Sequence, residues 1–499
     1  MVRSEIRFAR SMKRAARLVT FTGIPVWVSL SVFLTILLGV AIRLPGLRSD
    51  FWLDEIWSLQ AAREARSAAD FFLTIRTDNN HVLNSLWLYA VSGAADVKVF
   101  RLLSFAASVA TIPLAFLAAL RWSRPAALLS GALVALSFPL AVVTTEARGY
   151  GLALAFALTA FLALARHLDE PSPGTAAAFG ASASLGLLAH LSFVHVLAAA
   201  FAWSAWRIGR ADRPSRERLA SLARLWALPA GFAAWFWWVF ARHLVEGGGP
   251  VRAPLATAAE TAALTLGLPD AGAWRPLALA AAAAVLVAGC LRLRRDGDDG
   301  WLFFAVVVFA SPAAVVAATG YTILEPRHVS LSILFLLVLL ARVAASLGGR
   351  GRAARAAAAA GLLVFAGGNL HRFASFVREG RGHYLEALRE IARESPGPSV
   401  SIGSDNDFRN GLTVSFYEAY LPPGVRIVYV PRDRWPLEGP DWVIVHATEA
   451  DAVAAASIEA AGIRYVLDRE WRFAGPSGLC WFVYRKRTGE NLPPGEERR

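Results

Sequence analysis

Long apolar runs separated by short polar connections dominate the first three quarters of the chain. Most of these runs measure roughly 17–25 residues, the length that a helix needs to cross a lipid bilayer. They predict about eleven membrane spans, although the run at 193–206 is short and the stretch 177–206 can be divided differently. The predicted spans are 23–42, 101–120, 125–144, 149–166, 175–191, 193–206, 225–242, 275–292, 301–319, 328–346 and 354–370.

Two shorter elements are expected between the first two spans, in the connection 43–100. The stretch 54–67 predicts a helix that begins at Asp54, because an acidic residue there precedes a polar, alanine-rich segment. The stretch 82–95 is apolar but too short to cross a bilayer comfortably. We expect both helices to lie along the membrane surface, since counting 82–95 as a span would invert every later connection.

The pattern changes after residue 371, where the apolar runs shorten and turn residues appear. Short alternating segments are typical of strands, and a longer amphipathic segment is typical of a helix. Their alternation predicts a small α/β domain at 371–499, which follows a membrane domain at 1–370. The expected strands are 398–403, 425–430, 442–446, 465–467 and 480–484, and the expected helices are 383–393 and 451–461.

Composition and charge support a polytopic membrane protein. Of the residues, 56% are hydrophobic and the mean hydropathy is +0.45, which excludes an ordinary soluble domain. A net charge of +13 would suggest nucleic acid as a partner of a soluble protein, but the arginines gather in every second connection between spans. We therefore expect no nucleic-acid partner, and the positive-inside rule places the N-terminus in the cytoplasm and both 43–100 and the C-terminal domain outside. The arginine-rich connections are 121–124, 166–174, 207–224, 292–300 and 342–355.

An acidic pair, Asp54 and Glu55, follows the first predicted span. Two adjacent carboxylates at a membrane face are costly to desolvate and therefore indicate a functional site. One carboxylate could deprotonate an acceptor hydroxyl while the other positions it, or both could hold a divalent cation. The alternative is a helix N-terminus, where acidic residues are favoured by the helix dipole. The nearby Trp57 fits an interfacial belt as well as a surface on which a sugar stacks.

A second polar cluster, Asp78-Asn79-Asn80-His81, precedes the apolar stretch 82–95. It supplies a carboxylate, two amides and an imidazole on the predicted outer face. These groups could contact a sugar or a phosphate. The structural alternative is a capped turn that starts a helix, since Asp and Asn are frequent caps.

A third cluster, with Glu146, Arg148 and Tyr150, lies at the outer end of the third predicted span. Its guanidinium group suits a phosphate, because its donors match phosphate oxygens. The alternative is an ordinary interfacial Glu–Arg pair with a tyrosine anchor. Because this loop is expected on the same side of the membrane as Asp54, the functional interpretation is favoured.

The last candidates lie at the outer ends of later spans. Arg327 and His328, in Glu325-Pro-Arg-His, suit a lipid-linked phosphate, and the alternative is an interfacial arginine whose stem lies in the apolar layer. His190 and His195 flank the turn after the fifth span. Each of these two is interpreted as a hydrogen-bonded histidine between packed helices in preference to a ligand.

Together these motifs resemble the polyprenyl-phosphate-sugar-dependent glycosyltransferases of the C superfamily (GT-C), in the branch of protein O-mannosyltransferases and lipid A aminoarabinose transferases. The resemblance is strong over 40–170 and weaker over 171–370. Its motifs are Trp-Leu-Asp54-Glu55-Ile-Trp57-Ser, Asp78-Asn-Asn-His81-Val-Leu, Arg101-Leu-Leu-Ser104, Glu146-Ala-Arg148-Gly-Tyr150 and Glu-Pro-Arg327-His328.

Three departures from the family pattern affect the expected substrate. The Pro-Pro that often follows the second motif is replaced here by Val82-Leu83, and the family more often has Arg-Tyr where this chain has Arg327-His328. The aminoarabinose transferases carry an Asp in the second outer loop, whereas the similar place here lies near Tyr150. We therefore do not expect their substrate.

The resemblance implies a GT-C type membrane domain and an inverting transfer of a sugar from a polyprenyl-phosphate donor to an acceptor hydroxyl. Asp54 would act as base with help from Glu55, while Arg148, Arg327 and His328 would stabilise the departing phosphate. The acceptor would be a lipid, glycan or protein of the cell envelope, at the outer face of the inner membrane. The sequence requires no cofactor and leaves metal dependence open; if a divalent cation takes part, Asp54 and Glu55 would hold it. The expected substrate-binding residues are Trp57, Asp78, Asn80, His81, Arg101, Glu146 and Tyr150.

Two rival functions make different predictions. A lipid or sugar transporter, such as a flippase without transferase activity, predicts charges in mid-span and two similar halves, and the sequence shows few such charges and no duplication. A sensor protein predicts a ligand pocket in 371–499, for which Asp405-Asn-Asp407-Phe-Arg409 is a candidate. A solvated turn is the favoured interpretation of that segment.

Overall fold

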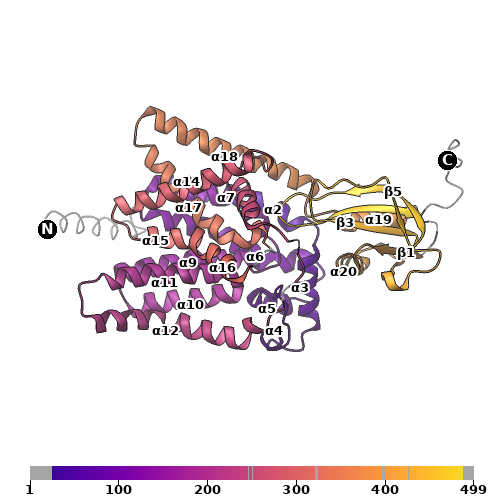
Figure 1. The fold of residues 1–499 in the computed structure, drawn as a ribbon, viewed down its shortest axis with the longest axis horizontal. Helices are drawn as coiled ribbons and strands as arrows, with labels where there is room; N and C mark the ends of the chain where they lie inside the picture. The colour runs from indigo at the N-terminus through magenta and orange to yellow at the C-terminus, as the bar shows by residue number, and fades with distance from the viewer. Residues whose placement is uncertain are drawn as a thin grey trace. The chain divides into compact units, whose positions relative to one another are not determined.

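The structure, a computed structural model, describes residues 25–486 except 246, 250, 321–323, 396, 398 and 425 (Figure 1). The basic N-terminal segment and the first two residues of the first predicted span lie outside the described residues. Contacts divide the chain into two compact units. The membrane unit comprises Met1–Leu47 and Ala62–Phe373, and the C-terminal unit comprises Arg48–Ala61 and Ala374–Arg499.

Helices make up the membrane unit. Among the described residues, nine helical segments are long and apolar enough to cross a membrane, so the chain is a multi-pass membrane protein as predicted. Each of them covers one of the predicted runs. They are Val26–Arg48 (α2), Val97–Leu120 (α6), Tyr150–Asp169 (α9), Leu191–Gly209 (η1, Leu191–Phe193, and α11, Val194–Gly209), Ser215–His243 (α12, Ser215–Val239, and η2, Ala241–His243), Trp274–Arg295 (α14), Trp301–Thr319 (α15, Trp301–Ala305, η3, Val306–Ala310, and α16, Ser311–Thr319), Pro326–Leu347 (η4, Pro326–Val329, and α17, Ser330–Leu347) and Arg352–Glu394 (α18, Arg352–Glu379, and α19). The last segment continues into the C-terminal unit, to which α19 belongs.

Two of the eleven predicted runs form shorter helices. The run 175–191 becomes α10, Pro173–Ala189, which has 17 residues. The run 125–144 is broken into α7, Arg124–Leu136, and α8, Phe138–Val143. Pro139 explains the break, because it has no N–H to donate to the carbonyl oxygen of Ala135, four residues earlier, and in a continuous helix its ring would clash with that carbonyl.

Buried polar side chains satisfy both ends of this break. The guanidinium of Arg43 donates to the carbonyl oxygens of Val134 and Ala135, each at 3.2 Å, in the last turn of α7. The side-chain oxygen of Asn369 accepts from the first amide of α8, on Phe138, at 2.7 Å. The backbone groups that the break frees from helical pairing are therefore satisfied inside the membrane unit.

Both short helices expected between the first two spans are present. The helix predicted at 54–67 is α3, Leu53–Glu64, and the one predicted at 82–95 is α5, Val82–Ala90. At nine residues α5 is far too short to cross a bilayer. A short helix, α4, at Asp70–Leu73 lies between them in sequence, and α13, Pro254–Leu266, is a further short helix of the membrane unit.

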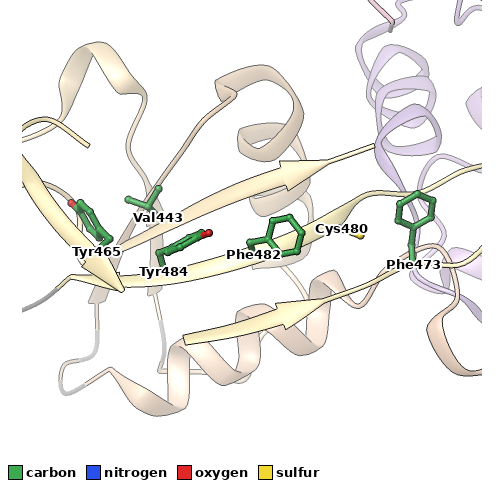
Figure 2. Packing of buried hydrophobic residues seen from close by; sticks show 6 residues of the cluster. All are labelled: Val443, Tyr465, Phe473, Cys480, Phe482 and Tyr484. Carbon is green, nitrogen blue, oxygen red and sulfur yellow. The ribbon is translucent and has the colours of Figure 1, made fainter. Parts of the chain in front are cut away.

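The C-terminal unit holds a six-stranded sheet in the order β2-β1-β3-β6-β5-β4. The first three strands are parallel to one another, and the remaining neighbours are antiparallel. Its apolar core includes Tyr465, Phe482 and Tyr484 (Figure 2). Helix α20 packs on β1 and β2 and against α19. The elements are α19 (Tyr384–Glu394), β1 (Ser399–Ser404), α20 (Asp407–Glu418), β2 (Arg426–Tyr429), β3 (Trp442–Ala447), β4 (Ser457–Ala460), β5 (Ile463–Trp471) and β6 (Cys480–Lys486).

One prediction for this unit is wrong and one helix was missed. The stretch 451–461 was expected to be a helix because it is rich in alanine, but its second half is β4, which pairs with β5. Ala461 and Gly462 both have positive φ, 52° and 73°, and this two-residue turn imposes a hairpin. The missed helix is α20, which contains the segment expected to be a solvated turn.

Candidate functional site

The predicted site residues fall into both units. The C-terminal unit carries Asp54, Glu55 and Trp57. The membrane unit carries the phosphate-binding and most of the substrate-binding candidates. These are Asp78, Asn80, His81, Arg101, Glu146, Arg148, Tyr150, Arg327 and His328.

Three aromatic rings and a guanidinium form a buried cluster in the membrane unit. The imidazole of His81, directly before α5, stacks on that of His190 with ring centroids 4.6 Å apart. The ring of Tyr150 lies 5.7 Å from His81 and 4.4 Å from His190. The guanidinium of Arg148 lies over the Tyr150 ring at 5.2 Å. Residues from three separate connections are thus brought together, and we call them the ring cluster.

Arg327 and His328 act on the same cluster electrostatically. Burial lowers the pKa of His81 well below its ordinary value, and the charges of His190, Arg148, His328 and Arg327 lower it further. Burial, together with Arg148, His195 and Arg327, lowers the pKa of His190 to about 3. Both imidazoles are therefore neutral at pH 7, and the positive charge of this region resides on the two arginines.

The loop that carries Arg148 is held by side chains of α5 and α6. The amide of Asn84 donates to the carbonyl oxygen of Ala147 at 2.6 Å, and the hydroxyl of Ser104 donates to that of Arg148 at 2.8 Å. Gly149 is needed here because a Cβ atom would lie 1.7 Å from the carbonyl oxygen of Ala189. This close approach brings the loop to the end of α10, next to His190.

A compact turn at the start of α17 carries Arg327 and His328. The side chain of His328 accepts from the backbone amide of Glu325, and the Glu325 side chain accepts from the His328 amide, which is a reciprocal capping box. The guanidinium of Arg327 pairs with the Glu325 carboxylate at 2.8 Å. Since Nδ1 of His328 is an acceptor, a neutral His328 carries its proton on Nε2.

Three predicted substrate-binding residues make structural contacts. The amide of Asn80 donates to the carbonyl oxygens of Phe71 and Ile75, both at 2.9 Å. A carboxylate oxygen of Asp78 accepts from the backbone amide of Gly247 at 2.9 Å. Asp78 therefore anchors the loop that contains the glycines at 247–249. The guanidinium of Arg101 donates to the carbonyl oxygen of Leu47, near the end of α2, at 3.3 Å.

The acidic pair occupies the second and third positions of α3. Glu55 is fully buried, and its carboxylate accepts from the backbone amide of Trp52 at 3.3 Å, while the Glu55 amide donates to the Trp52 carbonyl oxygen at 2.9 Å. This is the capping contact that the structural alternative expects of an acid at a helix start. Asp54 is partly exposed. The two carboxylates therefore have different surroundings.

His190 and His195 both make the hydrogen bonds predicted for histidines between packed helices. The imidazole of His195 bonds the Ser311 hydroxyl at 2.9 Å, and that of His190 accepts from the backbone amide of Ser192 at 3.1 Å. The sequence did not predict that His190 also stacks on His81 in the ring cluster. The available signal was its place at the outer end of an apolar run, on the same predicted side as Arg148.

A metal site remains a prediction. Among the described residues, no group of three or more His, Cys, Asp or Glu side chains is placed to hold a metal ion. A cation held by Asp54 and Glu55 alone would involve only two such residues. The geometry of the described residues leaves this prediction as it stood.

The chain matches no protein-family model and no curated protein. Among solved structures it is similar to ArnT from Cupriavidus metallidurans bound to undecaprenyl phosphate, with 13% identity and a TM-score of 0.47 over 94% of this chain and 99% of that one. It is also similar to the archaeal oligosaccharyltransferase AglB from Archaeoglobus fulgidus in complex with an inhibitory peptide and a dolichol-phosphate, with 12% identity and a TM-score of 0.48 over 84% and 69% of the two chains. Both belong to the superfamily that the sequence motifs resemble. Similarity at this level assigns no activity, donor or acceptor to the present chain.

Proposed function

We propose that this chain is an inverting membrane glycosyltransferase that moves a sugar from a polyprenyl-phosphate donor to an acceptor hydroxyl. The proposed architecture is a membrane domain at 1–370 and an outer α/β domain at 371–499. The host membrane would be an inner membrane, with the N-terminus in the cytoplasm. The acceptor would be a lipid, glycan or protein of the cell envelope.

The observation that carries the proposal is the buried Arg148 guanidinium over the Tyr150 ring, beside the stacked imidazoles of His81 and His190. The charge of Arg327 acts on the same two imidazoles and lowers their pKa values. A phosphate leaves as a stable anion, so its departure is favoured by fixed cations and does not need a general acid. Guanidinium groups suit this role because their donors match phosphate oxygens. In a buried site such charges act more strongly than they would in water.

The two acids would have separate roles. Asp54, which is partly exposed, would take the proton from the acceptor hydroxyl as it attacks the sugar. Glu55 would hold the start of α3 through its contact with the Trp52 amide, and so would assist Asp54 through the backbone. His328 would join the arginines at the phosphate, and Trp57, His81, Glu146 and Tyr150 would contact the substrates.

The test is transfer of labelled sugar from a panel of polyprenyl-phosphate donors in membranes. We expect Asp54→Asn to reduce turnover by about 10²–10⁴-fold, the usual contribution of a general base, with normal folding. Glu64→Gln, at the other end of α3, is the matched control and should keep activity. Near-normal transfer by Asp54→Asn would refute the assignment of the base. No transfer by the intact chain with any donor would favour a transporter.

A further inference from the structure

The segment that carries the acidic pair belongs, by its contacts, to the C-terminal unit. Residues Arg48–Ala61 cluster with Ala374–Arg499, although more than three hundred residues separate these two parts in sequence. Side chains of α20, the first turn of α19 and Arg381 make the contacts that place this segment. The question is therefore which of them fixes the start of α3.

The hydroxyl of Tyr417, near the end of α20, makes the central contact. It accepts a hydrogen bond from the backbone amide of Phe51 at 2.5 Å and donates one to the carbonyl oxygen of the same residue at 2.8 Å. Phe51 is fully buried, so water does not replace these partners. A single side chain thus satisfies both backbone groups of a residue that lies two positions before α3.

Further contacts hold the residues on either side. The Phe51 ring stacks on Phe416 of α20, with centroids 5.6 Å apart. The carboxylate of Asp50 accepts from the backbone amide of Leu385 at 3.1 Å, in the first turn of α19. It thereby satisfies an amide that has no partner within the helix. Arg381 donates to the Ser49 hydroxyl at 2.5 Å.

The first turn of α3 also contacts α20. The indole of Trp57 meets the Phe408 ring edge-on, with centroids 5.3 Å apart. Phe51 contacts the end of α20 and Trp57 contacts its start, so the two segments run in opposite directions. Asp54 lies between Phe51 and Trp57 in sequence and is therefore held from both sides.

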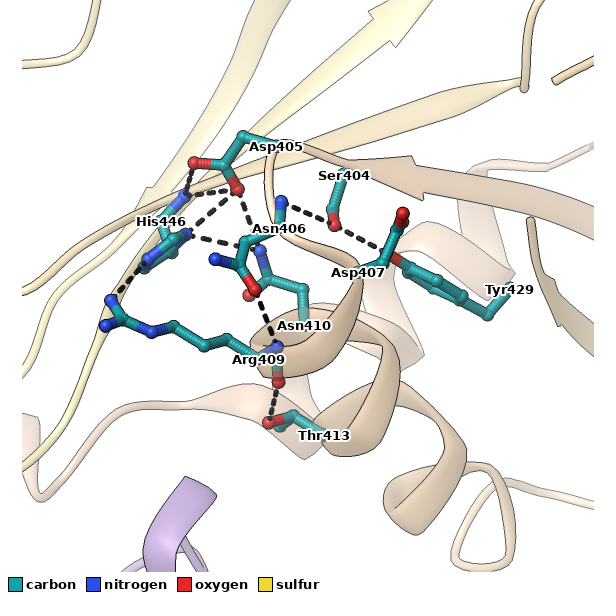
Figure 3. Close-up of polar contacts among 9 residues, drawn as sticks. All are labelled: Ser404, Asp405, Asn406, Asp407, Arg409, Asn410, Thr413, Tyr429 and His446. Atoms are coloured by element: carbon teal, nitrogen blue, oxygen red, sulfur yellow. Dashed lines mark hydrogen bonds and ion pairs between the residues drawn. The ribbon is translucent and has the colours of Figure 1, made fainter. Parts of the chain in front are cut away.

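Helix α20 is itself fixed to the sheet by the polar network at its start (Figure 3). The side chain of Asn406 caps the helix by accepting from the Arg409 amide at 2.9 Å. The Tyr429 hydroxyl, at the end of β2, bonds Ser404 at 2.6 Å and donates to Asp407 at 2.7 Å. The position of Tyr417 is therefore set by the sheet, and through it so is the backbone before Asp54.

We propose that Tyr417 is a positioning residue for Asp54: its hydroxyl fixes the Phe51 backbone and thereby the direction in which α3 presents its acid. This inference rests on the proposed function, in which Asp54 is the base. It gives the C-terminal unit a part in catalysis that requires no contact with the donor lipid. Misplacement of a catalytic group by about 1 Å can cost about 10²-fold in rate, so loss of the hydroxyl should be visible in turnover.

The test compares Tyr417→Phe with Tyr484→Phe in the full-length protein. Both changes remove a tyrosine hydroxyl that donates to a backbone carbonyl oxygen in the same unit, that of Phe51 for Tyr417 and that of Ala455 for Tyr484, but only the first releases Phe51. We expect Tyr417→Phe to lower kcat by about 10–100-fold with little change in KM for the donor, and to speed amide hydrogen exchange in 48–61. Tyr484→Phe should leave kcat and the exchange of 48–61 near those of the intact chain. Asp50→Ala, which removes a different anchor, should act in the same direction as Tyr417→Phe.

The outcomes separate this inference from the proposed function. Faster exchange in 48–61 with unchanged kcat would overturn the positioning role, as would unchanged exchange with unchanged kcat. An equal loss of kcat in Tyr417→Phe and Tyr484→Phe would overturn it too, because that result indicates a general effect on the unit. If Asp54→Asn retains transfer, the assignment of the base fails, while the exchange experiment still reports whether Tyr417 holds the segment.

Discussion

The ring cluster of the membrane unit and the segment Arg48–Ala61 of the C-terminal unit are built in different ways. This second region carries Asp54 and Glu55 and is named the acidic segment. The ring cluster gathers side chains from several connections inside one unit, and it buries them. The acidic pair stands on one short segment whose anchors come from α19 and α20. In the proposed function, the first region would bind the leaving phosphate and the second would activate the acceptor, so the two roles would depend on separate parts of the fold. A variant in one region should then lose the role of that region while the other region keeps its own.

Among variants of the membrane unit, the largest expected effect is the loss of the arginines. We expect Arg148→Gln and Arg327→Gln each to reduce kcat by about 10²–10³-fold, the usual result of removing one preorganised group that stabilises developing negative charge. Arg252→Gln is the control, since Arg252 pairs with Glu260 and has no assigned role at the cluster. Steady-state transfer assays give the measurement. If kcat falls as much in Arg252→Gln as in the other two variants, loss of any of these positive charges lowers transfer. That result would contradict a specific role for Arg148 and Arg327.

A smaller effect is expected from Gly149→Ala, which tests how the Arg148 loop is seated. The added Cβ would collide with the Ala189 carbonyl oxygen, so the loop must move away from α10. Overpacking of this kind usually costs about 1–3 kcal/mol, and we expect a lower thermal unfolding midpoint in detergent together with reduced transfer. Gly231→Ala is the control, because a Cβ there meets nothing within 4 Å. An unchanged midpoint for Gly149→Ala would contradict the described seating of the loop.

Asn80→Ala should act on stability more than on catalysis. Its amide bonds two backbone carbonyl oxygens, so the change should cost about 1–2 kcal/mol of unfolding free energy while kcat/KM of the folded protein stays near normal. Thr74→Ala, an exposed change in the same connection, should cost less. A large rise in KM at normal stability would instead restore the substrate-binding interpretation of Asn80.

The last prediction is a pH dependence of stability. The folded pKa values of His81 and His190 lie below that of an unfolded histidine, so the unfolded chain takes up protons first as the pH falls below about 6.5. Stability should therefore decline between about pH 6.5 and 5, by up to about 1.4 kcal/mol per pH unit for each group. His190→Gln should flatten the decline in thermal unfolding midpoints. The control His243→Gln should retain it, and a decline unaltered by His190→Gln would contradict the assignment.

The sequence predicted the local elements well because hydrophobic period and turn residues determine them. All the predicted spans form helices, and the outer motifs were recognised from residue types and spacing. What the pattern could not reveal depends on contacts distant in sequence. The break at Pro139 needs Arg43 and Asn369 to satisfy it. The bond between Tyr417 and Phe51 joins residues 366 positions apart, and no periodicity predicts it.

The sequence predicted which residue types form the candidate site. It did not predict which of these residues lie in the ring cluster and which only hold the backbone. The motifs identified Arg148, Arg327 and His81, which share one electrostatic environment. The motifs did not distinguish Asn80, whose amide is used to hold a loop, from His81, which is in the ring cluster. Both have polar side chains in a polar tetrapeptide, and only the folded backbone decides which of them reaches the cluster.

The most direct measurement compares donor binding with transfer in the same two variants, Asp54→Asn and Arg327→Gln. Binding of a labelled polyprenyl phosphate and turnover of the matching polyprenyl-phosphate sugar are measured side by side in detergent-solubilised protein. We predict that Asp54→Asn binds the lipid phosphate as the intact chain does but transfers no sugar, whereas Arg327→Gln loses binding and transfer together. Equal losses of binding in both variants, or transfer that survives Asp54→Asn, would contradict the separation of roles between the acidic segment and the ring cluster.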